Sequence, residues 1–326
     1  MSDKPVNLEK GLPQEYLQYD KRRHGMDHEF YPWSMLHQRQ PIRWPQGKKL
    51  AVWLNISVQF FPMDQKGKPF KVPGGMTMPY PDLRHYSLRD YGNRVGIFRI
   101  LKAVDHYGVK PTFAISSRLV EQAPLLIHKL AQRGDEILCH GWDMDSIHWG
   151  DAEQAQANNE AGLIEKSLAV LRQATGQPIT GWLSPAQNQS EITAKLLANN
   201  GVKYCGDWVN DDMPYFFNNT GANPQHQGAL LNIPLSTELD DQFILQNNLH
   251  SEASYVQQVC DACDLLLNEA EHHGGRMLAL NIHPWLLGQP HRIAHFEQLL
   301  AYLTSKSDIW FATGSEIHSA FSQQSA

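Results

Sequence analysis

Two histidines that follow apolar runs are the residues of this sequence best suited to proton transfer. His140 directly follows the run over residues 136–139 and precedes Asp143 and Asp145. His283 directly follows the run over residues 277–282 and lies two residues before Trp285. An imidazole gains or loses its proton near neutral pH, and a nearby carboxylate can orient the ring. The competing interpretation is a structural histidine hydrogen-bonded to the backbone.

Two acidic clusters also follow apolar runs. In residues 206–215, Asp207, Asp211 and Asp212 lie among aromatic residues that include Trp208. A carboxyl group beside apolar rings has a raised pKa, which suits acid–base chemistry. The competing interpretation is a solvated turn with aspartates as caps. The second cluster follows residues 230–234 and contains Glu238, Asp240 and Asp241.

Short apolar runs alternate with amphipathic segments along most of the chain. This rhythm predicts a parallel sheet with right-handed crossovers, and seven or eight such units favour a deformed (β/α) barrel. A barrel places its active site at the carboxyl ends of its strands, where His140, Ser184, Asp207 and His283 are expected. The long segment 63–91 is expected to be a loop that covers the site. Strands are predicted over residues 50–59, 111–116, 136–140, 179–184, 202–205, 230–234, 277–283 and 309–313. Helices are predicted over 97–107, 124–133, 152–175, 192–199, 251–271 and 292–303, with a last one from about 315.

Residues 1–45 lack sustained periodicity and are expected to form an extended N-terminal arm. Residues 46–326 are then one α/β barrel domain. Cys260 and Cys263 fit the buried stripe of a helix better than a metal or redox motif, because no second cysteine pair exists.

The composition argues against several classes of partner. The 326-residue chain has a net charge of −6 and no cluster of Lys and Arg, which argues against nucleic acid. Its longest apolar stretch is shorter than the ~20 residues that span a bilayer. The absence of a signal-like N-terminus predicts a cytoplasmic protein. Sequence templates for zincins, serine hydrolases, P-loop proteins and nicotinamide enzymes are absent.

The sequence resembles the polysaccharide deacetylase superfamily, and most closely its branch of allantoinase-like and cyclic-imide hydrolases. The resemblance runs from about residue 44 to the C-terminus. It implies a deformed barrel, hydrolysis of C–N bonds other than peptide bonds, and a homo-oligomer. It rests on DYGNRVG (90–96), KPTF (110–113), GDEILCHGW (134–142), GWLSP (181–185), DWVNDDMPY (207–215) and HPWLLGQPHR (283–292).

This chain departs from the metal-binding pattern of that superfamily. The expected acid pair after the first strand is replaced by the stretch from Asn55 to Ser57, and the expected second histidine by Met144. A thioether is a poor ligand for a divalent metal. The resemblance therefore implies hydrolysis of a small cyclic or linear amide without a metal. A zinc-type deacetylase that uses His140, His148 and an aspartate is the first alternative, and a catalytically silent ligand-binding barrel is the second.

Roles follow for the main hypothesis. Asp207 or Asp145 would activate water, and His283 would protonate the leaving nitrogen. His140 and backbone N–H groups would hold the oxyanion, and Arg292 would pair with a substrate carboxylate or carbonyl. The residues expected to contact the substrate are Asn55, Trp142, Asp143, Ser184, Trp208, Asp211, Asp212, Glu238, Trp285 and Arg292.

Overall fold

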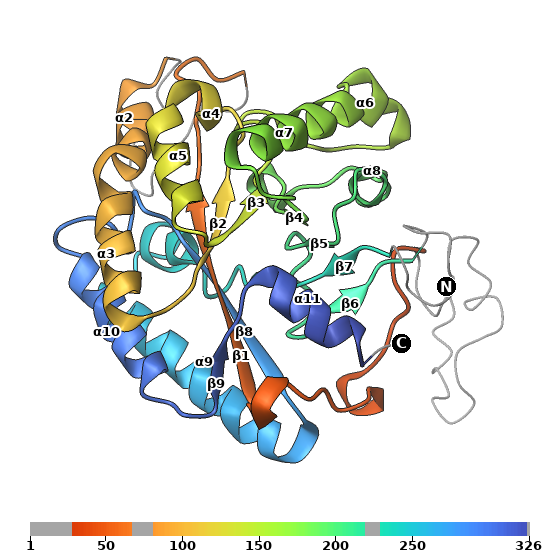
Figure 1. The fold of residues 1–326 in the computed structure, drawn as a ribbon, viewed down its shortest axis with the longest axis vertical. Coiled ribbons are helices and arrows are strands. Elements are labelled where there is room, and N and C mark those ends of the chain that lie inside the picture. Colours follow the sequence, from red (N-terminus) through yellow and green to blue (C-terminus); the bar gives the residue numbers. More distant parts are fainter. Residues whose placement is uncertain (1–27, 67–80, 219–228, 325–326) are drawn as a thin grey trace, which may run out of the picture.

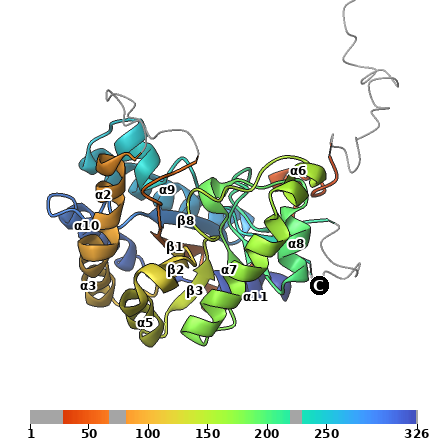
Figure 2. The ribbon, with the colours of Figure 1, turned by 90° about the horizontal axis from the view of Figure 1, so that it is seen from above.

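A curled sheet forms the centre of the protein, and helices cover its outer face (Figures 1 and 2). The computed structural model describes residues 28–66, 81–218 and 229–324. The strand order is β6-β7-β5-β4-β3-β2-β1-β8, with β9 beside the start of β1, and among these strands only β6 and β7 pair antiparallel. The strands are β1 Leu50–Val58, β2 Thr112–Ile115, β3 Glu136–Cys139, β4 Gly181–Trp182, β5 Tyr204–Cys205, β6 Tyr215–Phe216, β7 Leu231–Asn232, β8 Arg276–Ile282 and β9 Ile309–Phe311.

The helices agree with most of the predicted ranges. Two differences stand out: Asn159, with φ of 55°, splits the helix expected over 152–175, and a helix occupies part of the loop expected over 63–91. The α-helices are α2 Leu83–Tyr91, α3 Ile97–Tyr107, α4 Leu119–Gln122, α5 Pro124–Gln132, α6 Ala152–Ala157, α7 Glu160–Thr175, α8 Thr193–Asn199, α9 Glu252–His273, α10 Ile293–Thr304 and α11 Gly314–Ser322. Short 3₁₀ turns are η2 Leu36–Gln38, η3 Pro45–Gly47 and η5 Pro185–Gln187, and π-helical turns are η4 Gly92–Gly96 and η6 Phe243–Asn247.

The two faces of the sheet bury different clusters of side chains. Along β1, Leu50, Val52, Leu54, Ile56 and Val58 join the outer core beneath the helices. The intervening Ala51 and Trp53 belong to the inner core. Side chains alternate between the faces of a strand, so Asn55 and Ser57 also point inward, at the carboxyl end of β1. These four inner residues change from apolar to polar toward the carboxyl end of the strand.

The same alternation places the two histidines inside the curl. On β8, Met277 and Ala279 belong to the inner core, so Asn281 and His283 continue its inner row. On β3, Leu138 belongs to the inner core, and His140 follows two residues later. Both histidines therefore face the interior at one rim of the sheet.

The sheet is curled but not closed. Its path ends at β6 on one side and at β8 on the other, so the deformed (β/α) barrel predicted from the α/β rhythm has the form of a half-barrel. The described part of the predicted N-terminal arm, from residue 28, runs past β6, where Arg39 forms an ion pair with Asp211 at 2.6 Å. The Trp44 indole N–H donates to the carbonyl of Arg276 at the start of β8. The boundary of the arm at residue 45 stays a prediction.

Candidate active site

His283 forms a buried pair with Asp241. Its backbone N–H donates to Asp241 Oδ2 at 2.9 Å, and its Nδ1 lies 2.6 Å from Asp241 Oδ1. Asp240 Oδ2 lies 3.9 Å from the same nitrogen. Burial disfavours the charged ring, but the charges of Asp241 and Asp240 and the hydrogen bond outweigh it and raise the pKa of His283. Nε2 makes no hydrogen bond to the described residues, so its proton is available to a ligand.

A chain of polar side chains links this pair to β1. Asn281 Nδ2 donates to Asp240 Oδ2 at 2.8 Å, and a carboxylate can only accept, so Asn281 Oδ1 must accept on its other side. Asn55 Nδ2 and Ser57 Oγ each donate to that oxygen at 2.7 Å. The orientation of Asn55 is thereby set. Its Oδ1 is buried and finds no donor among the described residues.

His140 has the opposite environment. Its Nδ1 lies 2.9 Å from the carbonyl oxygen of Leu183, which can only accept, so Nδ1 carries the ring hydrogen and Nε2 is an acceptor. Gln59 Nε2 lies 3.3 Å from His140 Nε2. Burial lowers the pKa of His140 to about 4, and the charge of His283 acts in the same direction. His140 is therefore neutral at pH 7.

An arginine that the sequence analysis missed completes this rim. Arg89, on α2, is buried, and its guanidinium lies 3.7 Å from the centre of the Trp285 ring and 5.0 Å from that of Phe61. Burial lowers its pKa to about 9. Its positive charge opposes protonation of His283, whose ring centre lies 5.6 Å from that of Trp285. The expected neighbourhood of His283 and Trp285 thus also contains a cation.

Close backbone approach holds the loop after β8 against η4. A Cβ on Gly92 would lie 2.7 Å from the Trp285 nitrogen, and one on Gly96 would lie 2.0 Å from the Pro284 oxygen. Asn93 Nδ2 donates to the Gln59 carbonyl at 2.8 Å. π-Helical turns are frequent at functional sites, and η4 here positions the residues that follow His283.

Asp207 and Ser184 are buried and hydrogen-bonded to each other. Asp207 Oδ1 accepts the Ser184 N–H at 2.6 Å, and Oδ2 accepts from Ser184 Oγ at 2.8 Å and Gln189 Nε2 at 2.5 Å. Burial raises the pKa of Asp207 to about 6, against the effect of these hydrogen bonds. Both oxygens are engaged, so the structure supports a positioning role for Asp207 better than the predicted role of water-activating base.

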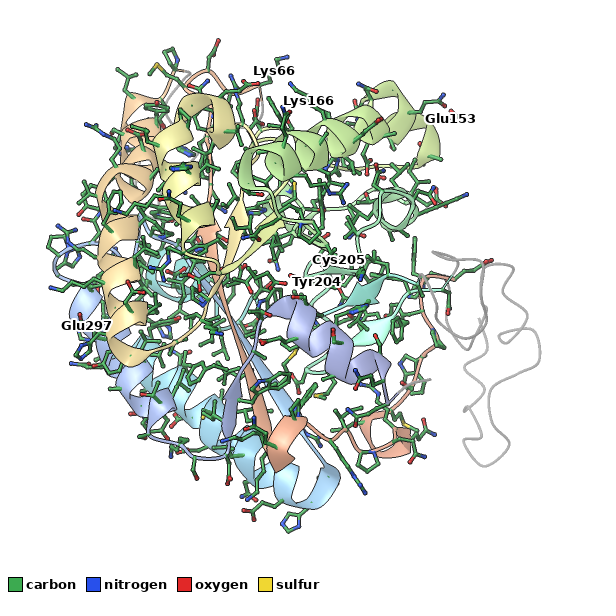
Figure 3. The ribbon with its side chains drawn as sticks, viewed as in Figure 1. Lys66, Glu153, Lys166, Tyr204, Cys205 and Glu297 are labelled. Atoms are coloured by element: carbon green, nitrogen blue, oxygen red, sulfur yellow. The ribbon has the colours of Figure 1, made fainter. Side chains whose placement is uncertain are left out.

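The residues after His140 organise their own loop. Asp143 accepts from the Asp145 and Ser146 backbone, and Arg118 Nη1 donates to it at 2.8 Å. Asp145 Oδ2 accepts from the backbone of Lys66. Trp142 faces α7, where Lys166 Nζ lies 3.4 Å from its ring centre (Figure 3 labels Lys166 on that helix). Asp143 and Trp142, both expected to contact the substrate, thus contact Arg118, the backbone of their own loop and Lys166 of α7.

Five other expected substrate contacts lie apart from the two imidazoles or make different contacts. Trp208 packs against Phe30 and Tyr31 of the arm, with ring centres 5.2 and 5.8 Å away. Arg292 pairs with Glu252 at 2.8 Å, between the starts of α10 and α9. The remaining residues are Asp211, bound to Arg39, and the exposed Asp212 and Glu238, of which Glu238 has no hydrogen bond to the described residues.

The donor set does not fit the divalent metal of the wider superfamily. The amide of Gln59 lies beside His140 Nε2, and the Met144 sulfur accepts from Ser116 Oγ at 3.7 Å. A thioether is a poor ligand for zinc. Among the described residues, the group with potential ligand atoms within 4.8 Å of one another is Asp240, Asp241 and His283. In that group, Asp241 and His283 Nδ1 already satisfy each other.

The alternative ligand set with His148 is not assembled. His148 Nδ1 lies 3.7 Å from Glu160, with the ring packed against Trp182, and it forms no ligand group with His140 and an aspartate in the described ranges. His148 is buried beside Glu160, so the described residues give no support to that alternative ligand set.

Comparisons with known proteins agree with this architecture. Residues 86–205 match the family model described as "Polysaccharide deacetylase". A Schizosaccharomyces pombe protein named "Putative polysaccharide deacetylase" is 24% identical over 300 residues, covering 86% of this chain and 92% of that protein. The "Peptidoglycan deacetylase" of Helicobacter pylori is 22% identical, covering 71% of this chain and 85% of its own.

Solved structures share the fold. A probable polysaccharide deacetylase from Pseudomonas aeruginosa superposes with a TM-score of 0.76 at 22% identity, covering 90% of this chain and 99% of that one. The PuuE allantoinase superposes with a TM-score of 0.74 at 22% identity, covering 89% and 97%. Residues 86–205 thus match the polysaccharide deacetylase family model, and the likeness to these solved structures shows that the chain shares their half-barrel fold.

Proposed function

We propose that this chain hydrolyses a C–N bond, other than a peptide bond, in a small cyclic or linear amide such as a ureide or imide. The observation that carries the proposal is the contrast between two imidazoles at one rim. Asp241 and Asp240 raise the pKa of His283, while burial lowers the pKa of His140 to about 4. Titratable groups whose environments drive their pKa values apart are typical of acid and base roles in one site.

His283 serves as the acid. As the C–N bond breaks, its electron pair stays on the departing nitrogen, and that nitrogen takes the proton from His283 Nε2. Asp241 keeps Nδ1 hydrogen-bonded and stabilises the charged ring before transfer. This is the role expected for His283 from the sequence.

His140 serves as the acceptor for water. A water hydrogen replaces the Gln59 N–H on the Nε2 lone pair, and the water proton moves to Nε2 as the water oxygen bonds to the carbonyl carbon. Exchange with solvent then restores the starting protonation of both rings. The expected role of His140 as an oxyanion donor is not supported, because Nδ1 donates to Leu183 and Nε2 carries no hydrogen.

The polar inner face suits a substrate rich in N–H groups. Asn55 Oδ1 and Gln59 Oε1 are buried acceptors without a donor among the described residues. An unsatisfied buried acceptor costs about 1–3 kcal/mol, which a substrate N–H or a bound water would relieve. A ureide or imide brings such donors on either side of its carbonyl, and Arg89 offers a cation for the carbonyl oxygen as negative charge develops there.

A second candidate is deacetylation of an N-acetylated sugar. The family match and the deacetylases among the similar proteins favour it. The same acid and acceptor would serve, because an acetamide also presents a carbonyl and a leaving nitrogen.

A substrate panel tests these functions. Purified protein, dialysed against a chelator, is incubated with cyclic ureides, cyclic imides and N-acetylglucosamine oligomers, and released amine or carboxylate is measured. We expect turnover of a ureide or imide that is lost in His140→Gln and His283→Gln and kept in His128→Gln, an exposed control on α5. Turnover of the sugars alone supports the second candidate. Binding without any turnover would show a silent barrel and refute both.

Two expectations about the setting of the protein stay predictions. In the ranges that the structure covers, no helix has both the length and the apolar character needed to cross a bilayer. The cytoplasmic location and the homo-oligomer await cell fractionation and a mass measurement in solution.

A further inference from the structure

A second pocket lies at the open seam of the half-barrel. It has a volume of about 460 Å³ and lies between the arm, β6, the start of β8 and the end of α11. Its lining includes Leu36 and Arg39 of the arm, Phe216 of β6, Arg276 of β8 and Phe321 of α11. These elements converge on one side of the molecule in Figure 1. The volume is in the range of small-molecule sites.

The seam pocket is distant from the candidate active site. Arg276 begins β8 and His283 follows its end, so seven residues of extended chain separate them. At about 3.3 Å per residue the separation is roughly 23 Å. A ligand in the pocket would therefore not occupy the space beside the imidazoles.

Arg276 provides a buried donor at this pocket. The side chain is 4% exposed, although it carries a charge. Its Nε lies 3.1 Å from Glu269 Oε2, and its Nη1 lies 3.4 Å from the Gly274 carbonyl. Its Nη2 is buried and has no acceptor among the described residues. A buried guanidinium nitrogen without an acceptor is costly, and an oxygen ligand would satisfy it.

The rest of the lining is apolar or polar, with Arg39 as its other cation. Leu36, Met213, Phe216 and Phe321 supply apolar and aromatic walls, and among the described residues that line the pocket none carries a carboxylate. Arg39 is already paired with Asp211, which lies outside the lining. A preference of the pocket for a ligand oxygen therefore comes from Nη2 of Arg276 and not from a net positive charge. Guanidinium groups match the planar acceptor pair of a carboxylate.

We propose that the seam pocket binds a small aromatic carboxylic acid, with the carboxylate on Arg276 and the ring against Phe216 and Phe321. The ligand would join the arm to both edges of the open sheet. This binding is independent of the hydrolase proposal, because it uses none of the residues of the candidate active site.

The test uses 2-naphthoate and its neutral analogue 2-naphthalenemethanol, with binding followed by saturation-transfer NMR and calorimetry. We expect naphthoate to bind the full chain and the alcohol to bind about ten-fold more weakly, as loss of one charged hydrogen bond implies. His283→Gln should bind naphthoate as the wild type does. Absence of naphthoate binding at millimolar concentration would refute the proposal.

Two matched pairs of variants locate the site. Leu36→Trp fills the pocket from the exposed arm, and Leu125→Trp adds the same bulk at an exposed position on α5. Only the first should abolish binding. Arg276→Gln should weaken binding about ten-fold. Arg292→Gln, which breaks a different ion pair, should not. Equal binding by Leu36→Trp and Leu125→Trp would overturn the assignment, even where Arg276→Gln fails to fold.

Discussion

Replacing Asp241 by Asn tests the pair that charges His283. Asp241 accepts both the backbone N–H and the ring Nδ1 of His283, and it is fully buried. Asparagine keeps the shape and one acceptor but removes the negative charge. The pKa of His283 should therefore fall below its wild-type position, because burial is then opposed by the charge of Asp240 alone, whose nearest oxygen is 3.9 Å away.

The magnitude follows from the interaction that is lost. A hydrogen bond to a charged group contributes about 1.5–3 kcal/mol, so we expect the free energy of unfolding at pH 7 to fall by roughly 2 kcal/mol. Loss of the protonated acid should lower kcat/KM by about 100- to 10,000-fold on any amide that the wild type hydrolyses. The ring should lose its charge rather than remain as an unpaired buried cation.

The assay is a pH titration of ¹³C-labelled histidine by NMR, with His283 assigned from His283→Gln. Asp143→Asn is the matched control, because Asp143 is equally buried and hydrogen-bonded but lies on the loop after β3. We expect the titration of His283 to move down in Asp241→Asn and to stay in place in Asp143→Asn. An unchanged titration in Asp241→Asn would refute the assignment of His283 as the charged acid.

Three further substitutions probe the same site and its support. Arg89→Met removes a cation that opposes protonation of His283, so the NMR titration of that ring should move up, opposite to the effect of losing Asp241; a downward shift would contradict the placement of the guanidinium. Gly96→Ala would bring a Cβ to 2.0 Å from the Pro284 oxygen, and chemical denaturation should show a loss of about 1–3 kcal/mol or more, whereas a neutral result would disprove the close approach. The raised pKa of Asp207, about 6, means that the folded state holds its proton more tightly than the unfolded state, so this group's contribution to stability falls as pH rises from about 4 to 6. The stability advantage of the wild type over Asp207→Asn should therefore shrink by roughly 2–3 kcal/mol between pH 4 and 7, and a constant difference would exclude that pKa.

Strand-end residues were the predictable part of this site. The apolar runs of β3 and β8 are legible in the sequence, and His140 and His283 follow them directly, so their position at one rim of an α/β barrel could be inferred. The short strands β4, β5 and β7 were also found, although the structure trims each predicted range to two residues.

Residues that act through tertiary contacts could not be chosen from the sequence. Glu238 was selected from its acidic cluster, but Asp241 is the member that meets His283, and only the path of the chain into η6 decides this. Arg89 was missed because the buried residues of α2 are His85 and Arg89, which hides the apolar periodicity of a helix. The available signal was that His85 and Arg89 lie four residues apart, on one face of a helix that Asp82 caps.

Contacts to the arm explain the other differences. Asp211 and Trp208 follow a strand end, as site residues should, but they bind Arg39 and the aromatic residues around Tyr31. A segment without periodicity gives no indication of the surface on which it lies. The residues between 67 and 80, part of the predicted covering loop, lie outside the described ranges.

The protonation states of the two rim imidazoles at pH 7 are the most direct test of this account, and ¹⁵N-detected NMR of histidine-labelled protein measures them. We expect His140 to be neutral with its hydrogen on Nδ1, and His283 to carry hydrogens on both nitrogens. A charged His140, a hydrogen on its Nε2, or a neutral His283 would contradict the division of acid and acceptor roles between them.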